Sequence, residues 1–452
     1  MAVYNAAWYA ATPFLSLVKR LKPGFRERLV PHGWPGAGKR PTVWPNVWQD
    51  VWLHAASGGE AYLAWEILKH FPDLRDHDRA AEPTTLLATS WTEQGVGVLD
   101  QAMVWCAVYR PEIAPRRAYV PFDAPTLMRK ALRAAMPKVV VLLETELWPG
   151  LLWACKVEDV PVLVVNGRLS RKSLAGYLAL GRFFREVAPQ RILAVSELDA
   201  RRFATLFGAD RVSVMPNIKF DRIATEEQTA PPDLQRLLDP AAPFVVLGSI
   251  RSEEEPALQE LLPALLAARP DCCVGVFPKH LHRVAAWSKF LDEAGIQWTR
   301  RTQLKSPAAA GSVVLWDVFG ELGQAYGLGQ AAFVGGSLRP LGGQNFLEPL
   351  AHGLIPCIGP YWENFAWVGT EIVDRGLVRV VPNATALLPA LLDSLERPAS
   401  RQEVASRFSA YIAPRRGGTK MACEAIAAYC ARNLRLISES ALGQDRHVVW
   451  KP

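Results

Sequence analysis

The sequence lacks the cysteine and histidine spacings that mark metal sites. Its seven cysteines are an odd number, and none of them stands at a metal-binding spacing. Most lie in apolar surroundings, which favours reduced, buried thiols in a cytoplasmic protein. His280 and His282 likewise have no companion ligands at a zinc spacing. No metal site is therefore expected.

The sequence also lacks a block of lysine and arginine interleaved with aromatic residues. The formal net charge is +7 and the pI is near 9.0, so the partners are expected to be anionic. Nucleic acid is the least expected of these, because its binding proteins usually carry such a block. A phosphorylated substrate or an acidic membrane surface fits the charge better.

A run long enough to span a membrane is missing at the N-terminus. Residues 1–18 are mostly apolar, but they contain Asn5 and Pro13, fall short of a spanning length and lack an early positive charge. A basic collar follows at once: Lys19, Arg20, Lys22, Arg26 and Arg28. This order predicts a monotopic anchor on the cytoplasmic face of a membrane. The alternative is an ordinary first helix packed on the domain.

The length and composition indicate two α/β domains. At 452 residues and 50% hydrophobic content, the chain exceeds one ordinary core. The predicted segments are an N-terminal membrane-associating segment and loop (1–48), a first domain (49–221), a polar, proline-containing linker (222–242), a second domain (243–420), and a C-terminal helix and tail (421–452).

Apolar runs predict the strands of both domains. In the first domain they cover 51–56, 85–89, 118–123, 139–143, 160–165, 191–196 and 212–216, and in the second 244–250, 272–277, 313–316 and 331–334. Continuous apolar runs are typical of parallel strands that are covered on both faces. The polar and glycine-containing loops that follow the second-domain runs are expected to share one edge of a sheet.

Charged residues follow several first-domain strands. Ser57 and Glu60 have the spacing of a capping box, although a carboxylate at this place also suits a general base. Glu144 and Glu146 follow the run 139–143, and a structural role is expected for at least one of them. Arg168 follows the next strand, where it suits a phosphate or carboxylate ligand; a solvated basic loop is the alternative.

The stretch 335–365 is the richest candidate site of the second domain. Gly335 and Gly336 follow a strand, and a second glycine pair precedes Glu348 at the start of an expected helix. This order allows backbone N–H groups to bind an anion while a carboxylate binds a ribose. The alternative is a glycine-rich turn between core elements. Asp76-His77-Asp78 also matches a metal-binding pattern, but its charged flanks favour a solvated turn.

Taken together, these motifs resemble the 3-deoxy-D-manno-octulosonate (Kdo) transferases of lipid A biosynthesis. The resemblance rests on GFRER (24–28), HAASGGE (54–60), PFDAP (121–125), ETELWP (144–149), NGRLSRKSLAGY (166–177), IKFD (218–221), PKH (278–280), FGEL (319–322), GGSL (335–338), GGQNFLEP (342–349) and GPYWENF (359–365). The family implies the GT-B fold, two Rossmann-like domains that face a central cleft. That fold would require the C-terminal helix to cross back onto the first domain.

The resemblance implies transfer of Kdo from CMP-Kdo to a hydroxyl of a lipid A precursor, with inversion and without a metal or cofactor. It places the protein at the cytoplasmic face of the bacterial inner membrane. Glu60 would be the general base. The implied donor-binding residues are Ser249, Lys279, His280, Gly320, Glu321, Gly335, Gly336, Asn345 and Glu348. The implied acceptor- or phosphate-binding residues are Ser57, Gly58, Glu144, Arg168 and Lys219.

Some positions depart from the family pattern. Gln344 and Phe346 replace its usual His and Pro, Lys279 replaces an Arg, and Ile250-Arg251 replaces a Thr-His pair. A divergent donor loop is therefore expected. Two alternatives stay open at this point: a GT-B transferase that uses another nucleotide sugar, and a non-catalytic protein of the same fold that binds a nucleotide or lipid.

Overall fold

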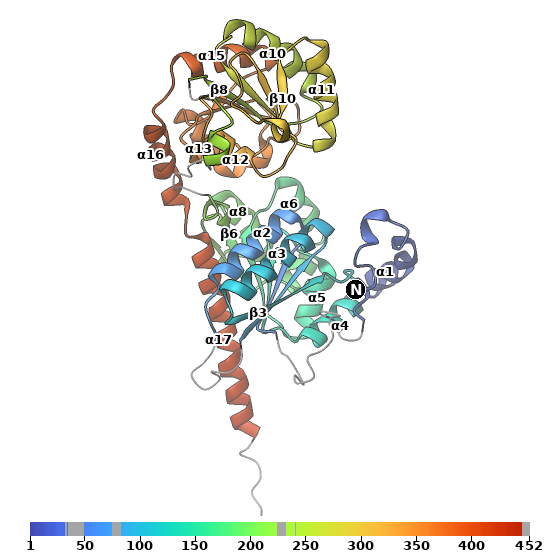
Figure 1. Cartoon of the computed structure of the whole chain (residues 1–452). Helices are drawn as coiled ribbons and strands as arrows, with labels where there is room; N and C mark the ends of the chain where they lie inside the picture. Colours follow the sequence, from blue (N-terminus) through green and yellow to red (C-terminus); the bar gives the residue numbers. More distant parts are fainter. Residues whose placement is uncertain (32–33, 35–48, 75–82, 224–231, 240, 445–452) are drawn as a thin grey trace, which may run out of the picture. The chain divides into compact units, whose positions relative to one another are not determined.

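The structure is a computed structural model that describes residues 1–31, 34, 49–74, 83–223, 232–239 and 241–444. The chain divides into two compact units, residues 1–222 with 415–452, and residues 223–414 (Figure 1). The Pro- and Gly-rich part of the expected segment 1–48, the Asp76-His77-Asp78 motif and much of the expected linker fall outside the described residues.

The first unit is built on a parallel seven-stranded sheet of order β3-β2-β1-β4-β5-β6-β7. Its strands are β1 (Val51–Ala55), β2 (Thr84–Ser90), β3 (Ile113–Tyr119), β4 (Val139–Leu143), β5 (Val162–Gly167), β6 (Arg191–Ala194) and β7 (Val212–Val214). Because neighbouring side chains of a strand face opposite sides, Trp52 joins one core cluster, whereas Val51 and Leu53 join the other.

Helices cover both faces of this sheet. They are α1 (Ala2–Leu15), α2 (Gly58–His70), α3 (Glu93–Tyr109), α4 (Pro125–Ala135), α5 (Pro149–Val157), α6 (Arg171–Leu178), α7 (Gly181–Glu186), α8 (Glu197–Phe207) and α17 (Gly418–Gln444). Short 3-10 turns lie at Lys19–Leu21, Glu27–Leu29, Ala209–Arg211 and Ile218–Phe220. Ser57, Thr92, Ser170 and Ser196 cap α2, α3, α6 and α8 with their hydroxyl groups, which fixes where these helices begin.

The C-terminal helix α17 belongs to the first unit, where it packs against α2 (Figure 1). Ala422, Cys423 and Ile426 enter the same core cluster as Leu53. The Asp221 carboxylate accepts hydrogen bonds from the backbone N–H groups of Gly417 and Thr419 at 2.7 and 2.6 Å. These hydrogen bonds join the segment where the chain leaves the first unit to the segment where it returns.

The second unit has a parallel seven-stranded sheet of order β10-β11-β9-β8-β12-β13-β14. Its strands are β8 (Phe244–Ile250), β9 (Cys273–Pro278), β10 (Trp298–Arg300), β11 (Val313–Leu315), β12 (Ala331–Val334), β13 (Pro356–Ile358) and β14 (Arg379–Val380). Its helices are α9 (Pro232–Gln235), α10 (Glu255–Ala268), α11 (Val284–Glu293), α12 (Leu322–Tyr326), α13 (Leu347–Ala351), α14 (Glu371–Asp374), α15 (Leu387–Glu396) and α16 (Arg401–Ile412). Further 3-10 turns lie at Leu281–Arg283, Arg301–Gln303, Glu363–Val368, Ala384–Ala386 and Ala413–Arg415.

Some strand predictions were wrong. The run 118–123 was expected to be a strand, but β3 ends at Tyr119 and begins at Ile113. β3 is an edge strand whose Arg116 and Arg117 are half-buried, so it has no continuous apolar run. β10, β13 and β14 were not predicted, because strands of two or three residues carry too little pattern.

Candidate functional site

Glu60 lies at the carboxyl edge of the first sheet, in the first turn of α2. One of its carboxylate oxygens accepts from the Ser57 hydroxyl at 2.8 Å, and the other accepts from the Ala56 backbone N–H at 2.7 Å. The Ser57 hydroxyl in turn accepts from the Glu60 N–H, so the predicted cap is confirmed. Glu60 is only 9% exposed, and burial raises its pKa although the hydrogen bonds to Ser57 and Ala56 lower it.

A second carboxylate, Glu146, lies close enough to Glu60 for their charges to interact. Burial, together with the charges of Glu60 and Glu144, raises the pKa of Glu146 to about 7. The Trp148 indole N–H donates to Glu146 across 2.6 Å. Glu146 was not among the predicted site residues, although its place in ETELWP, two residues after Glu144, was a sufficient signal.

Glu144 and Lys219 form an ion pair at the same edge. The Lys219 ammonium donates to the Glu144 carboxylate at 2.7 Å, and both side chains are mostly buried. Glu144 has a φ of +58°, a left-handed conformation that is rare for glutamate and is often found at functional sites. Glu60, Glu144, Glu146 and Lys219 thus form one charged cluster in the first unit.

Arg168, predicted to bind phosphate, follows β5 at this edge. Its backbone carbonyl accepts a hydrogen bond from the Thr145 hydroxyl, which ties it to the Glu144–Glu146 loop. The Arg168 side chain is partly exposed. The remaining predicted residue, Gly58, is buried beside Gln94, and a side chain there would come within 2.9 Å of it.

In the second unit, the glycine loop after β12 encloses a buried carboxylate that the sequence did not reveal. Glu254 is fully buried and accepts from the backbone N–H groups of Gly336, Ser337 and Leu338 at 2.5, 2.9 and 2.8 Å. The Gly335 N–H donates to the Gly248 carbonyl. These amides are therefore engaged by protein acceptors, and we do not assign them to a phosphate.

The loop approaches the end of β8 closely. A side chain at Gly335 would lie 2.6 Å from the Ser249 carbonyl oxygen, so the close approach requires glycine there. Ser249 has a φ of +53° beside an irregularity in the pairing of β8 with β9. The predicted donor residue Ser249 is thus held in a strained conformation next to the glycine loop.

Asn345 and Glu348 come together at the start of α13. The Asn345 amide donates to the Glu348 carboxylate at 2.8 Å, and its oxygen accepts from the Leu347 N–H. Glu348 keeps exposed surface, but crowding of its carboxyl group by protein atoms raises its pKa, while the Lys279 charge lowers it. Three predicted donor residues, Lys279, Asn345 and Glu348, are therefore neighbours.

Glu321 and its loop are held by other contacts. The Arg301 guanidinium donates to both Glu321 oxygens at 2.8 and 2.9 Å, and the Trp316 indole donates to one of them. Gly320 before it has a φ of +92°, and His280 is exposed with its ring parallel to that of His282. The Glu321 carboxylate has a clear structural function in this ion pair.

The N-terminal helix α1 docks on α4 through one side only. Tyr4 donates to Asp123 at 2.8 Å, and the Trp8 ring packs 5.8 Å from Phe122. Phe14 and Leu17, by contrast, are 71% and 76% exposed. In the described part of the chain, no helix is long and apolar enough to cross a membrane.

One member of the predicted basic collar is not at the surface. Arg28 is fully buried and donates to the carbonyl groups of Trp91 and Val120, and its guanidinium lies 4.4 Å above the Trp91 ring. Burial lowers its pKa to about 10. The partners of the Arg28 guanidinium are therefore aromatic rings and backbone carbonyl groups rather than a lipid headgroup. Lys19, Lys22 and Arg26 are exposed, as the prediction requires.

Comparisons with known proteins bear on both units. The family model of 3-deoxy-D-manno-octulosonic-acid transferase (kdotransferase) matches residues 24–222. The 3-deoxy-D-manno-octulosonic acid transferase of Bordetella pertussis is 29% identical over 387 residues, covering 83% of this chain and 86% of that protein. The Haemophilus influenzae protein of the same name is 26% identical, covering 93% and 96%. Over most of its length the chain is therefore similar to Kdo transferases.

The fold agrees with this similarity. A solved glycosyltransferase from Rickettsia africae aligns with a TM-score of 0.51 at 12% identity, covering 86% of this chain and 98% of that one. The protein is a glycosyltransferase of the two-domain GT-B fold.

Two of the departures from the family pattern lie in the core of the second unit. Phe346 is buried and packs 5.1 Å from the Phe365 ring and 5.9 Å from Trp362. Ile250 is fully buried at the end of β8. Both side chains therefore pack in the core of the second unit.

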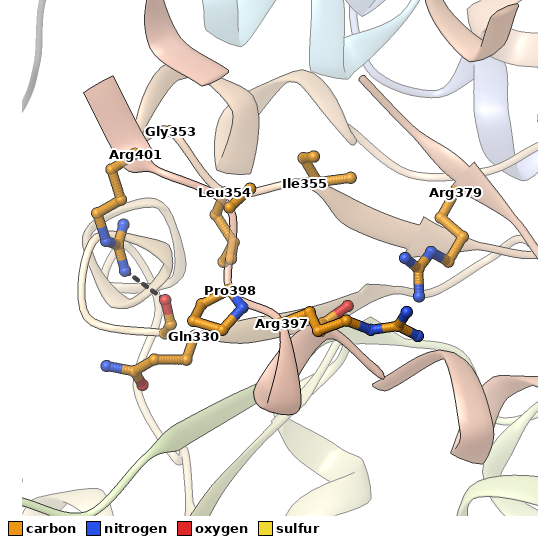
Figure 2. A pocket seen from close by; sticks show the side chains of 11 residues that line it. Gln330, Gly353, Leu354, Ile355, Arg379, Arg397, Pro398 and Arg401 are labelled. Carbon is orange, nitrogen blue, oxygen red and sulfur yellow. Dashed lines mark hydrogen bonds between the residues drawn. The ribbon is translucent and has the colours of Figure 1, made fainter. Parts of the chain in front are cut away.

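A small hollow of about 90 Å³ at the opposite edge of the second sheet is lined by arginines (Figure 2). Arg401 donates to the carbonyl groups of His352 and Gly329, and Arg379 donates to Ala390 and Asp393. Cations at the carboxyl ends of helices are stabilising. Arg379 and Arg401 are therefore engaged by backbone carbonyl groups and the Asp393 carboxylate, and we assign no ligand to the hollow.

Proposed function

We propose that the protein transfers Kdo from CMP-Kdo to a hydroxyl group of a lipid A precursor, with inversion at the anomeric carbon. Similarity to Kdo transferases supports the sugar and the donor. The observation that carries the chemistry is the buried Glu60 carboxylate at the carboxyl edge of the first sheet.

Glu60 has the properties of a general base for the acceptor hydroxyl. Each of its oxygens accepts one hydrogen bond, from Ser57 or Ala56, and retains a lone pair. Its raised pKa makes it a stronger base than an exposed carboxylate. The acceptor proton passes to Glu60 as the acceptor oxygen bonds to the anomeric carbon and the bond to the CMP phosphate breaks.

One base suffices for this displacement. The departing CMP carries its negative charge on phosphate and requires electrostatic stabilisation rather than a proton. In the second unit, Lys279 supplies a positive charge near Glu348. We assign the cytidine ribose to Glu348, oriented by Asn345, and further donor contacts to Ser249, His280, Gly320 and the Glu321 loop. Gly335 and Gly336 shape the glycine loop that follows β12.

In the first unit we assign the acceptor to the edge that carries the charged cluster. Arg168 is partly exposed there and suits a phosphate of the lipid. Glu144, paired with Lys219, and the Ser57–Gly58 turn border the same edge. α1 and the exposed cations that follow it, Lys19, Lys22 and Arg26, suit association with the cytoplasmic face of the bacterial inner membrane.

The decisive experiment is mass spectrometry of the product. Purified protein, CMP-Kdo and a tetraacylated lipid A precursor should yield a Kdo-bearing lipid. Glu60→Gln should lower kcat by at least about a hundredfold, because general base catalysis contributes roughly that much. Glu66→Gln is the matched control, since Glu66 is a buried acid on the same helix and contacts Lys69 and His70. Unchanged turnover in Glu60→Gln would refute the base assignment.

The same reagents distinguish two other functions from Kdo transfer. Competition between CMP and UDP for the donor site distinguishes a transferase that uses another nucleotide sugar. Tight binding of CMP-Kdo without turnover on several acceptors would indicate a non-catalytic binding protein.

A further inference from the structure

Helices α6 and α7 form a hairpin (residues 170–187) whose tip exposes apolar side chains. Leu178 and Leu180 are 41% and 57% exposed, and Ala175, Gly176 and Ala179 beside them are also exposed. Four exposed cations flank this tip: Arg171, Lys172, Arg182 and Arg185. Glu186 is the single acidic residue within 170–187. The tip is therefore both apolar and strongly basic.

The exposed leucines are not needed to pack the hairpin. Its inner side is already apolar, with Phe184 buried and Leu174, Tyr177 and Phe183 packed against the first core cluster. The Tyr177 and Phe184 rings contact each other at 4.9 Å. The outer leucines thus keep much of their surface uncovered by the described residues, and that surface is available for another apolar phase.

The hairpin is fastened to the edge that carries the proposed base. α6 begins four residues after β5 ends, and the Tyr177 hydroxyl donates to the Thr145 carbonyl at 3.4 Å. Thr145 lies between Glu144 and Glu146 and also donates to the Arg168 carbonyl. A surface that is bound through the hairpin tip would therefore lie next to the charged cluster.

We propose that the α6–α7 tip is a second membrane contact, separate from α1, in which Leu178 and Leu180 enter the interface of an anionic bilayer. Amphipathic helices bind bilayers in this way, with leucines at the acyl boundary and cations on the headgroups. Each cation near an anionic surface contributes about 1 kcal/mol. The four cations against one acid match an anionic lipid surface in charge.

This contact would serve the proposed function by holding the acceptor edge against the bilayer that contains a lipid acceptor. It deepens that proposal, yet it can be tested without donor or acceptor. A failure of vesicle binding is therefore distinguishable from a failure of sugar transfer.

An environment-sensitive fluorophore on the hairpin tests the contact directly. All seven native cysteines are buried, so L180C provides a selectively labelled site in the full chain. Vesicles of phosphatidylcholine and phosphatidylglycerol should shift its emission to the blue and brighten it, whereas phosphatidylcholine alone should not. V108C is the matched control, because Val108 is 67% exposed on α3 away from the hairpin. An L180C label that does not respond to anionic vesicles would overturn the proposal.

Charge variants test the energetics. R182Q/R185Q should weaken binding to the anionic vesicles by about 25-fold, since each cation is worth about fivefold. K289Q/K305Q removes the same formal charge from exposed positions of the second unit and should change binding less than about twofold. Equal binding by R182Q/R185Q and the wild type would contradict a membrane role.

Two other occupants of the tip would give different results. A label on L180C that responds to detergent-solubilised acceptor but not to vesicles would indicate a lipid-substrate site. A response to CMP without any lipid would indicate a surface that the chain itself covers when the donor binds. Either result would overturn the bilayer assignment.

Discussion

The Lys219 ammonium lies 2.7 Å from the Glu144 carboxylate and joins two motifs that are separated by 75 positions in the sequence. Glu144 begins the loop after β4 in a left-handed conformation, and Lys219 lies in the 3-10 turn Ile218–Phe220. The pair fixes a strained carboxylate beside Glu60, whose pKa the Glu144 charge raises. The charges of Glu144 and Lys219 therefore act on the proposed base, Glu60.

We predict that Lys219→Met lowers transfer activity by roughly tenfold and destabilises the protein by roughly 1–3 kcal/mol, because a mostly buried carboxylate loses its partner. Chemical denaturation and steady-state kinetics measure the two effects. The double variant Lys219→Met/Glu144→Gln should recover part of the lost stability. If the two single changes are additive in the double variant, Lys219 and Glu144 do not interact as described.

The pKa of Glu146 near 7 predicts a pH-dependent effect of Glu146→Gln. At pH 6 the wild-type carboxyl is mostly protonated, so glutamine should resemble it in activity. At pH 8 the wild type carries a further negative charge near Glu60, and the two proteins should differ. Profiles of kcat/KM between pH 5.5 and 8.5 measure this difference. A ratio of variant to wild-type kcat/KM that is the same at every pH would refute the assigned protonation state.

The same residue predicts a change in stability with pH. The folded-state pKa of Glu146 is raised, so the folded protein holds its proton more tightly than the unfolded chain. This contribution is complete below the unfolded pKa and is lost as pH rises through about 7. Relative to Glu146→Gln, the wild type should therefore lose roughly 1–3 kcal/mol of unfolding free energy between pH 5 and pH 8. Urea titrations at the two pH values measure the difference.

The sequence predicted the central strands well and the short edge strands poorly. The run 244–250 became β8 and 331–334 became β12 with the same bounds, because buried parallel strands are continuously apolar. β14 has two residues and gives no pattern. The mixed polarity of β3 hid the start of that strand, since its Arg116 and Arg117 are half-buried.

The charged residues show which contacts a local sequence pattern does not predict. The cap at Ser57 and Glu60 was predictable because both partners lie within one helical turn. Glu254 was not, because Ser252-Glu253-Glu254-Glu255 reads as a solvated helix start, and its partners lie at residues 336–338. Arg28 was misplaced for the same reason, since the rings and carbonyl groups that bury it lie at residues 91 and 119–122.

Glu254 yields a prediction for the donor unit. Glu254→Gln places amide N–H groups against backbone donors and should destabilise the protein by roughly 3 kcal/mol or more, as expected when buried hydrogen bonds to a carboxylate are lost. It should also weaken CMP binding, because residues 336–338 lose their acceptor. Glu253→Gln, at the exposed neighbouring position, is the control and should change neither property. Calorimetric titration with CMP and denaturant unfolding decide the matter; wild-type CMP affinity in a folded Glu254→Gln protein would contradict it.

The N-terminal segment provides the last prediction. Removing residues 1–20 should weaken membrane binding, with the α6–α7 tip as the remaining contact, and largely spare activity on detergent-solubilised acceptor. The docked side of α1 adds a cost, because the Tyr4 hydrogen bond to Asp123 and the Trp8 contact with Phe122 are lost. We expect that loss to lower the unfolding free energy by about 1–3 kcal/mol.

Phe14→Ser/Leu17→Ser separates the two contributions of this segment. Both side chains are largely exposed, so their loss should leave stability unchanged within about 0.5 kcal/mol while weakening vesicle binding. Co-sedimentation with anionic vesicles and denaturant unfolding measure the two properties on the same preparations. Unfolding of the truncated chain, together with wild-type vesicle binding by Phe14→Ser/Leu17→Ser, would mean that α1 is part of the domain core and not an anchor.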